Sequence, residues 1–208
     1  MDNLYYYTLI LTYILLFCAA SCAILKYNIV SKKNEKWYIY YIIFIFFIEL
    51  TSYLIPYFKT TSNAFLYPIY ISGEFFLITG IFIKKLNLNR YYFLATGLIG
   101  LIFLTAGQIF SQYEYNNDYS KAISNLLMII AIAYSLLQDI KNIKNKNSFQ
   151  LIDKMYFLYF TVSIFIFIFQ HQLLEFPVNY FSIFWITNNL MVCIIYALFI
   201  KTFLQLKK

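Results

Sequence analysis

Two glutamates, Glu49 and Glu74, lie inside long apolar segments of the sequence. A carboxylate at the centre of a membrane span costs on the order of 3 kcal/mol on insertion scales. Such a group normally faces the interior of a helix bundle and has a partner or a function. Glu49 and Glu74 are therefore the first candidates for a functional site.

Polar side chains recur regularly along the segment that carries Glu74. Asn63, Tyr67, Tyr70 and Glu74 follow one another in steps of 4, 3 and 4 residues. Such steps place the four side chains on one face of a helix. At a rise of 1.5 Å per residue, Glu74 lies roughly 15 Å along that helix from its start. The spacing predicts a polar stripe that runs from one membrane surface to about mid-membrane.

The chemistry of the two glutamates depends on what compensates their charge. No Lys or Arg lies deep in any apolar segment, and His171 is the single histidine. We therefore expect the glutamates to be protonated, to share a proton, or to meet His171 or a cationic ligand. These arrangements correspond to a proton relay, a pH sensor, or a site for an amine or a metal cation.

The elements that would position these residues are apolar runs long enough to cross a bilayer. The 208 residues are 62% hydrophobic and 12% charged, whereas a soluble domain has about 25% charged residues. A hydrocarbon core of about 30 Å takes about 20 helical residues. We predict an all-α polytopic membrane protein, a seven-transmembrane-helix bundle in one domain over residues 1–208, with spans at about 5–25, 37–55, 64–83, 91–110, 120–137, 155–174 and 181–200.

The orientation in the membrane follows from the distribution of Lys and Arg, because short cytoplasmic loops carry an excess of positive charge. Of the 16 cations, 14 fall in the first, third and fifth loops and the C-terminal tail, and only Lys59 and Lys121 fall on the other side. We expect the N-terminus outside and the C-terminus in the cytoplasm. The net charge of +7 is then mostly a topology signal, and no nucleic-acid partner is expected.

Polar residues of the other spans also concentrate in the outer half of the bundle. We predict an outward-facing cavity with these candidate ligand-binding residues: Glu49, Tyr53, Asn63, Tyr67, Tyr70, Glu74, Asn125, Gln170, His171, Asn188 and Asn189. The alternative is that the amides and glutamates only join helices through interhelical hydrogen bonds, which are worth about 0.6 kcal/mol each. The sequence leaves both interpretations open.

Several classes of membrane enzyme require residues that this sequence does not have. One histidine is too few for a seven-span zinc hydrolase of the ceramidase kind or for a bis-histidine haem protein. No Gly-x-Ser-x-Gly motif supplies a serine nucleophile, and the last span has no lysine for a retinal Schiff base. We expect no enzymatic activity, no metal and no cofactor. A two-carboxylate enzyme that acts on a lipid through Glu49 and Glu74 stays open.

Two segments resemble a known group of proteins. Residues 63–75 (NAFLYPIYISGEF) resemble the Asn, aromatic, Tyr and Glu-Phe pattern of a family of small uncharacterised seven-span bacterial membrane proteins. Residues 184–189 (FWITNN) are similar to the Trp and Asn positions of that family. The resemblance implies a seven-helix fold in the bacterial cytoplasmic (inner) membrane and no established activity.

The longest predicted loop has 17 residues, from 138 to 154, so no loop holds an output domain. We therefore expect a receptor-like or sensory protein of the lipid bilayer that binds a small ligand or a proton in the outer cavity. Its basic loops would contact a cytoplasmic protein partner, and a homo-oligomer is compatible with this function. The alternatives are a small-solute or ion transporter or channel, and a membrane accessory or effector of a bacterial antiviral, CRISPR-associated, defence locus.

Overall fold

The computed structural model describes residues 2–30, 35–58, 63–110, 116–141, 148–175 and 177–206, in which no β-strand occurs. Its long helices are α1 (Asp2–Leu25), α3 (Lys36–Leu54), α4 (Leu66–Lys85), α5 (Tyr91–Ile109), α6 (Asn117–Lys141), α7 (Gln150–Ile168) and α9 (Val178–Gln205). The short elements are α2 (Tyr27–Val30), the 3-10 helix η1 (Ile55–Phe58) and α8 (Gln170–Glu175). The seven long helices are long and apolar enough to cross a membrane, which confirms the seven predicted helices.

Several helix bounds differ from the prediction by a few residues, among them bounds of α6, α7 and α9. Helix α6 begins at Asn117, three residues before the predicted start of that span, so Lys121 lies within the helix. Helix α7 ends at Ile168 rather than at residue 174, and the polar residues that follow form the separate α8. Helix α9 begins at Val178, directly after Pro177. Proline has no backbone N–H and a fixed φ, which suits it to a helix start.

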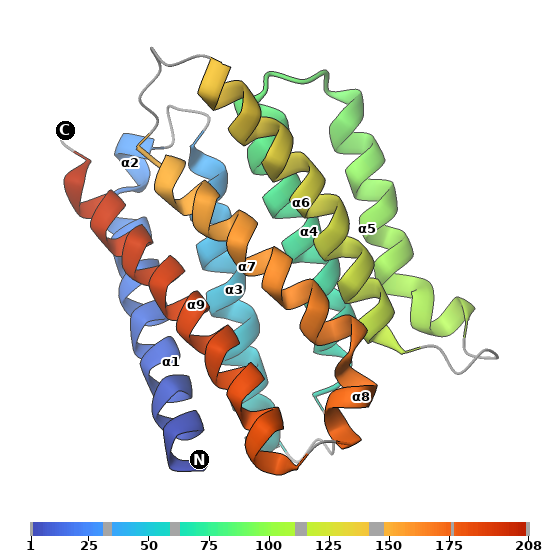
Figure 1. Cartoon of the computed structure of the whole chain (residues 1–208). Helices are drawn as coiled ribbons and strands as arrows, with labels where there is room; N and C mark the ends of the chain where they lie inside the picture. The colour runs from blue at the N-terminus through green and yellow to red at the C-terminus, as the bar shows by residue number, and fades with distance from the viewer. Residues whose placement is uncertain are drawn as a thin grey trace.

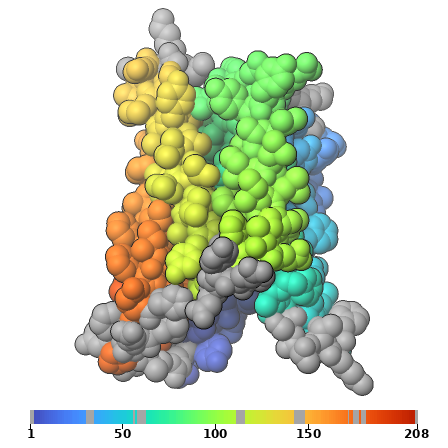
Figure 2. Space-filling model, turned by 90° about the vertical axis from the view of Figure 1, so that its right-hand side faces the viewer, coloured from blue at the N-terminus to red at the C-terminus, as the bar shows by residue number. Residues whose placement is uncertain are grey.

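Six of the long helices form a closed ring, and α5 packs outside it (Figure 1). Around the ring, α1 contacts α3, α3 contacts α4, α4 contacts α6, α6 contacts α7, α7 contacts α9, and α9 contacts α1. Helix α5 packs mainly against α4 and also touches α6. Figure 2 shows α5 and α6 forming much of one outer face. Helix α4 therefore has neighbours on three sides.

Helix α4 packs closely against aromatic rings of α3. Gly73 lies against Phe44, and an added Cβ would be 2.1 Å from Cζ of that ring. Gly80 lies in the same way against Trp37, where an added Cβ would be 2.6 Å from Cζ3. The missing side chains let the rings contact the α4 backbone directly. This close packing holds the helix that carries Glu74 in place.

The termini lie at opposite ends of the bundle (Figure 1). We call these the N-terminal end, where α1 begins and α3 stops, and the C-terminal end, where α9 stops. Most described cations are on helix ends at the C-terminal end: Lys26, Lys36, Lys84, Lys85, Arg90, Lys141, Lys154 and Lys201. This is the separation of charge on which the predicted orientation depends.

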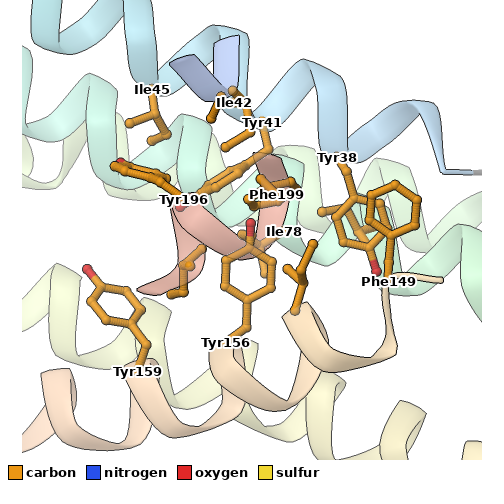
Figure 3. Packing of buried hydrophobic residues seen from close by; sticks show 14 of the residues in the cluster. Tyr38, Tyr41, Ile42, Ile45, Ile78, Phe149, Tyr156, Tyr159, Tyr196 and Phe199 are labelled. Atoms are coloured by element: carbon orange, nitrogen blue, oxygen red, sulfur yellow. The ribbon is translucent and has the colours of Figure 1, made fainter. Parts of the chain in front are cut away.

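Buried aromatic and aliphatic side chains fill the ring interior toward the C-terminal end (Figure 3). The Tyr38 ring stacks on Phe149 with centroids 4.3 Å apart, and Tyr41 meets Tyr156 edge to face at 5.5 Å. These four residues, with Phe199, define the aromatic plug. All five side chains are buried. The plug closes the interior on this side.

Candidate functional site: a cavity at the N-terminal end of the bundle

A cavity of about 510 Å³ lies inside the ring in the half next to the N-terminal end. Every helix of the ring contributes to its wall, together with Gln170 of α8. The exposed residues Asn63 and Ala64 border it, so the cavity reaches the surface at this end. Its deepest wall includes Tyr41 of the aromatic plug. The cavity is therefore open at the N-terminal end of the bundle and closed on the other side by the aromatic plug, which forms its floor.

Most of the predicted site residues lie at this cavity. The wall includes seven of them: Glu49, Asn63, Tyr67, Tyr70, Gln170, Asn188 and Asn189. They come from α3, α4, α8, α9 and the residues just before α4. The structure brings them together around one space, and their role in binding stays a prediction.

A buried ion pair lies at the cavity wall. Lys121 of α6 pairs with Glu74 of α4, and both side chains are only 1% exposed. The Tyr70 hydroxyl donates a hydrogen bond to Glu74 Oε1 at 2.9 Å, and Lys121 Nζ lies 4.5 Å from the centre of the Tyr70 ring. Lys121 and Tyr70 line the cavity, and Glu74 lies behind them. Glu74 therefore does not line the cavity itself but holds two residues that do, Tyr70 and Lys121.

The expectation that neither glutamate meets a lysine or an arginine was wrong for Glu74. Lys121 was counted with the loop cations because it was the second residue of the predicted span, whereas α6 begins at Asn117 and holds Lys121 more than one turn from its start. The long apolar stem of lysine lets its ammonium reach along the helix to Glu74. A lysine at the otherwise cation-poor end of the bundle was the one sequence signal for this pair.

Two further predicted residues do not line the cavity. Tyr53 is 62% exposed on the outer face of α3, with its hydroxyl 3.3 Å from that of Tyr57. Asn125 is fully buried between helices and donates a hydrogen bond to Ser163 Oγ on α7 at 3.1 Å. Asn125 therefore joins helices, as the alternative interpretation of the amides proposed. The side chain of His171 lies outside the described residues.

Glu49 borders two spaces at once. It lines the main cavity and also a second cavity of about 130 Å³, shared with Tyr13, Leu16 and Tyr53 among others. Within the described part of the chain, no lysine, arginine or histidine pairs with it, and no side chain or backbone N–H donates to it. Glu49 is thus a half-buried carboxyl group that borders both cavities and has no counter-charge among the described residues.

Asp118 adds a second carboxylate to the cavity wall. Its side chain accepts hydrogen bonds from the Tyr67 hydroxyl at 3.1 Å and from Asn116 Nδ2 at 2.7 Å. The residue is 9% exposed. Asp118 was not predicted from the sequence, because this residue precedes the predicted span and looks like an ordinary loop residue. The wall thus holds two carboxyl groups, Glu49 and Asp118, of which Glu49 was predicted from the sequence.

Three amides of the wall have a buried polar atom without a hydrogen-bond partner among the described residues. These atoms are Gln170 Oε1, Asn188 Oδ1 and Asn189 Nδ2. An unpaired buried polar atom costs about 1–3 kcal/mol. The wall therefore contains buried polar atoms whose hydrogen-bonding capacity is unused among the described residues.

A second network of buried charges lies at the C-terminal end. Lys85 of α4 contacts Asp139 of α6 at 2.5 Å and Asp153 of α7 at 2.7 Å. The Tyr38 hydroxyl of α3 donates to Asp153 Oδ1 at 2.5 Å, and Asp153 is fully buried. This network joins four helices beyond the aromatic plug. The sequence prediction treated Lys85 as a loop cation and did not find it.

No protein-family model matches this chain, and no curated protein or solved structure is similar to it. Among the described residues, no group of three or more His, Cys, Asp or Glu side chains is placed to hold a metal ion. The resemblance to small seven-span bacterial membrane proteins stays a prediction. The cavity geometry is therefore the basis for any statement about function.

Proposed function

We propose that this multi-pass membrane protein is a receptor that binds a small molecule in the cavity from the outer side and acts on a cytoplasmic partner. The single observation that carries the proposal is a cavity of about 510 Å³ that reaches the surface at one end of the bundle and has a buried ion pair at its wall. Pockets of this size are typical of small-molecule sites. The bacterial inner membrane and the seven-span family belong to the same proposal.

The aromatic plug favours a receptor over a transporter. Tyr38, Tyr156 and Phe199 are at most 2% exposed and fill the interior beyond the cavity floor (Figure 3). A transporter must expose its site alternately to both sides of the membrane. A densely packed interior resists such opening, because it would separate many side-chain contacts. A transporter or channel is the alternative function, and the labelling experiment below distinguishes it from a receptor.

Helices α4 and α6 offer a route from the cavity to the other end. Glu74 and Lys121 join them at the cavity wall, and Lys85 and Asp139 join them at the C-terminal end. A ligand that weakens the contact between Glu74 and Lys121 would shift α4 relative to α6. Because Lys85 and Asp139 join the same two helices, the shift would also change their contact at the C-terminal end. The basic helix ends around Lys85 would then present the change to a cytoplasmic partner. Because Glu74 is held by Lys121, a two-carboxylate lipid enzyme has less support.

Access to the cavity from each side tests the proposal. In a protein whose natural cysteines are replaced by serine or alanine, we expect Val192→Cys, which lies in the cavity wall, to react with a charged, membrane-impermeant thiol reagent only from the outer side. Ser148→Cys is the matched control, because Ser148 is exposed at the C-terminal end and should react only from the cytoplasmic side. Reaction of Val192→Cys from both sides, or solute flux through liposomes, would favour a transporter instead.

A further inference from the structure

Around the cavity, negative charge exceeds positive charge. The wall holds Glu49, Asp118 and Lys121, and Glu74 lies directly behind Lys121. Among the described residues at the cavity, three carboxyl groups thus stand against one ammonium group. The wall contains no arginine. A bound anion would meet this excess of negative charge, whereas a bound cation would reduce it.

We infer that the ligand is a small organic cation, an amine or a quaternary ammonium, whose charged nitrogen binds beside Glu49. This inference rests on the proposed receptor function and names the class of ligand that the cavity takes. Glu49 is half-buried among apolar helices and has no counter-charge among the described residues, and an uncompensated carboxylate in such surroundings is costly. A cationic ligand supplies the missing charge.

Aromatic side chains make up a large part of the wall and suit a cation with apolar substituents. The wall includes Tyr5, Tyr13, Tyr41, Tyr67, Tyr70, Tyr159, Phe167, Trp185 and Tyr196. Tyr13 and Tyr196 are close enough to Glu49 to interact with it electrostatically. An ammonium within about 6 Å of an aromatic ring centre is attracted by the ring, and quaternary ammonium groups are recognised in this way.

Lys121 is poorly placed to bind an anion. Its ammonium is engaged by Glu74, and it also lies 3.4 Å from the Tyr70 hydroxyl and over the Tyr70 ring. An anionic ligand would have to compete with a buried carboxylate for this group. The ammonium group of Lys121 is therefore already paired with a carboxylate, whereas Glu49 has no charged partner among the described residues.

Glu49 is a better anchor than Asp118. Asp118 already accepts hydrogen bonds from Tyr67 and Asn116, whereas Glu49 has no donor among the described residues. The unpartnered amide atoms of Gln170, Asn188 and Asn189 lie in the same wall.

Binding of defined probes to the purified full-length protein tests this inference. The cations are choline, tetraethylammonium and benzyltrimethylammonium. The controls are 3,3-dimethylbutan-1-ol, a neutral molecule with the shape of choline, and the anion 3,3-dimethylbutanoate. We expect at least one cation to bind and to raise the melting temperature, and neither control to do so. Binding by the neutral or anionic probes but by no cation would overturn the inference, as would no binding by any probe.

Substitution of Glu49 locates the charged group. We expect Glu49→Gln to weaken cation binding by about tenfold or more, because the ligand loses a buried ionic partner, and Glu49→Asp to keep part of it. Glu35→Gln is the matched control, since Glu35 lies at the other end of α3 and outside the cavity. Unchanged cation affinity in a folded Glu49→Gln protein would contradict the inference. The receptor proposal is tested separately by Val192→Cys, so one-sided labelling without cation binding would leave that proposal standing.

Discussion

Lys121→Met is expected to destabilise the protein by about 3–5 kcal/mol, because it removes one partner of a buried ion pair and leaves the other charge uncompensated. Lys121 and Glu74 are each only 1% exposed, so water cannot replace the lost contact. Methionine keeps much of the apolar stem, which limits the change to the charge. The free energy of unfolding in a mild detergent, followed by tryptophan fluorescence, measures the effect.

Two further variants separate the charge effect from a packing effect. Lys121→Met with Glu74→Gln removes both charges, and we expect this double variant to recover most of the lost stability. Lys141→Met is the matched control, since Lys141 is exposed at the last turn of the same helix. A Lys121→Met protein as stable as the Lys141→Met protein would contradict the ion pair.

Lys85→Met should also cost about 3–5 kcal/mol, because Asp139 and Asp153 would face each other without the cation that separates them. Asp153 is fully buried, whereas Asp139 is 19% exposed. Addition of Asp153→Asn is therefore expected to restore more stability than addition of Asp139→Asn. The same unfolding measurement compares the three proteins.

The neighbouring lysine provides the control for this prediction. Lys84 is exposed at the adjacent position of α4, where its ammonium lies 5.2 Å from the centre of the Phe93 ring. Lys84→Met should change the free energy of unfolding by less than about 1 kcal/mol, as is usual for surface charges. Equal losses in the Lys84 and Lys85 variants would show that the network does not stabilise the bundle.

The helices and the α4 stripe could be predicted because both depend on local sequence. Long apolar runs identify spans by length alone, and all seven appear as helices. Helical periodicity placed Asn63, Tyr67 and Tyr70 on one face, and these residues share the cavity wall. Periodicity fixes the face of a helix, whereas it does not say which neighbour that face meets.

Contacts between distant segments therefore escaped the sequence. Lys121 and Glu74 are 47 residues apart, and Tyr38 and Asp153 are 115 residues apart. Both networks lie near helix ends, where an error of a few residues turns a buried charge into a loop residue. Tyr53 shows the same sensitivity: it shares a stripe with Glu49 but lies on the outer face.

The central claim is that the cavity is the ligand site, and a variant that fills it tests this claim most directly. Val192 lines the cavity, whereas Leu190, two residues earlier on α9, is 45% exposed and does not line it. Titration of benzyltrimethylammonium into the Val192→Trp and Leu190→Trp proteins compares the two positions. The cavity site predicts that Val192→Trp weakens binding by about tenfold or more, roughly 1.4 kcal/mol per factor of ten, and that Leu190→Trp binds like the wild-type protein. Equal affinities in all three proteins, or no binding to the wild-type protein, would contradict the claim.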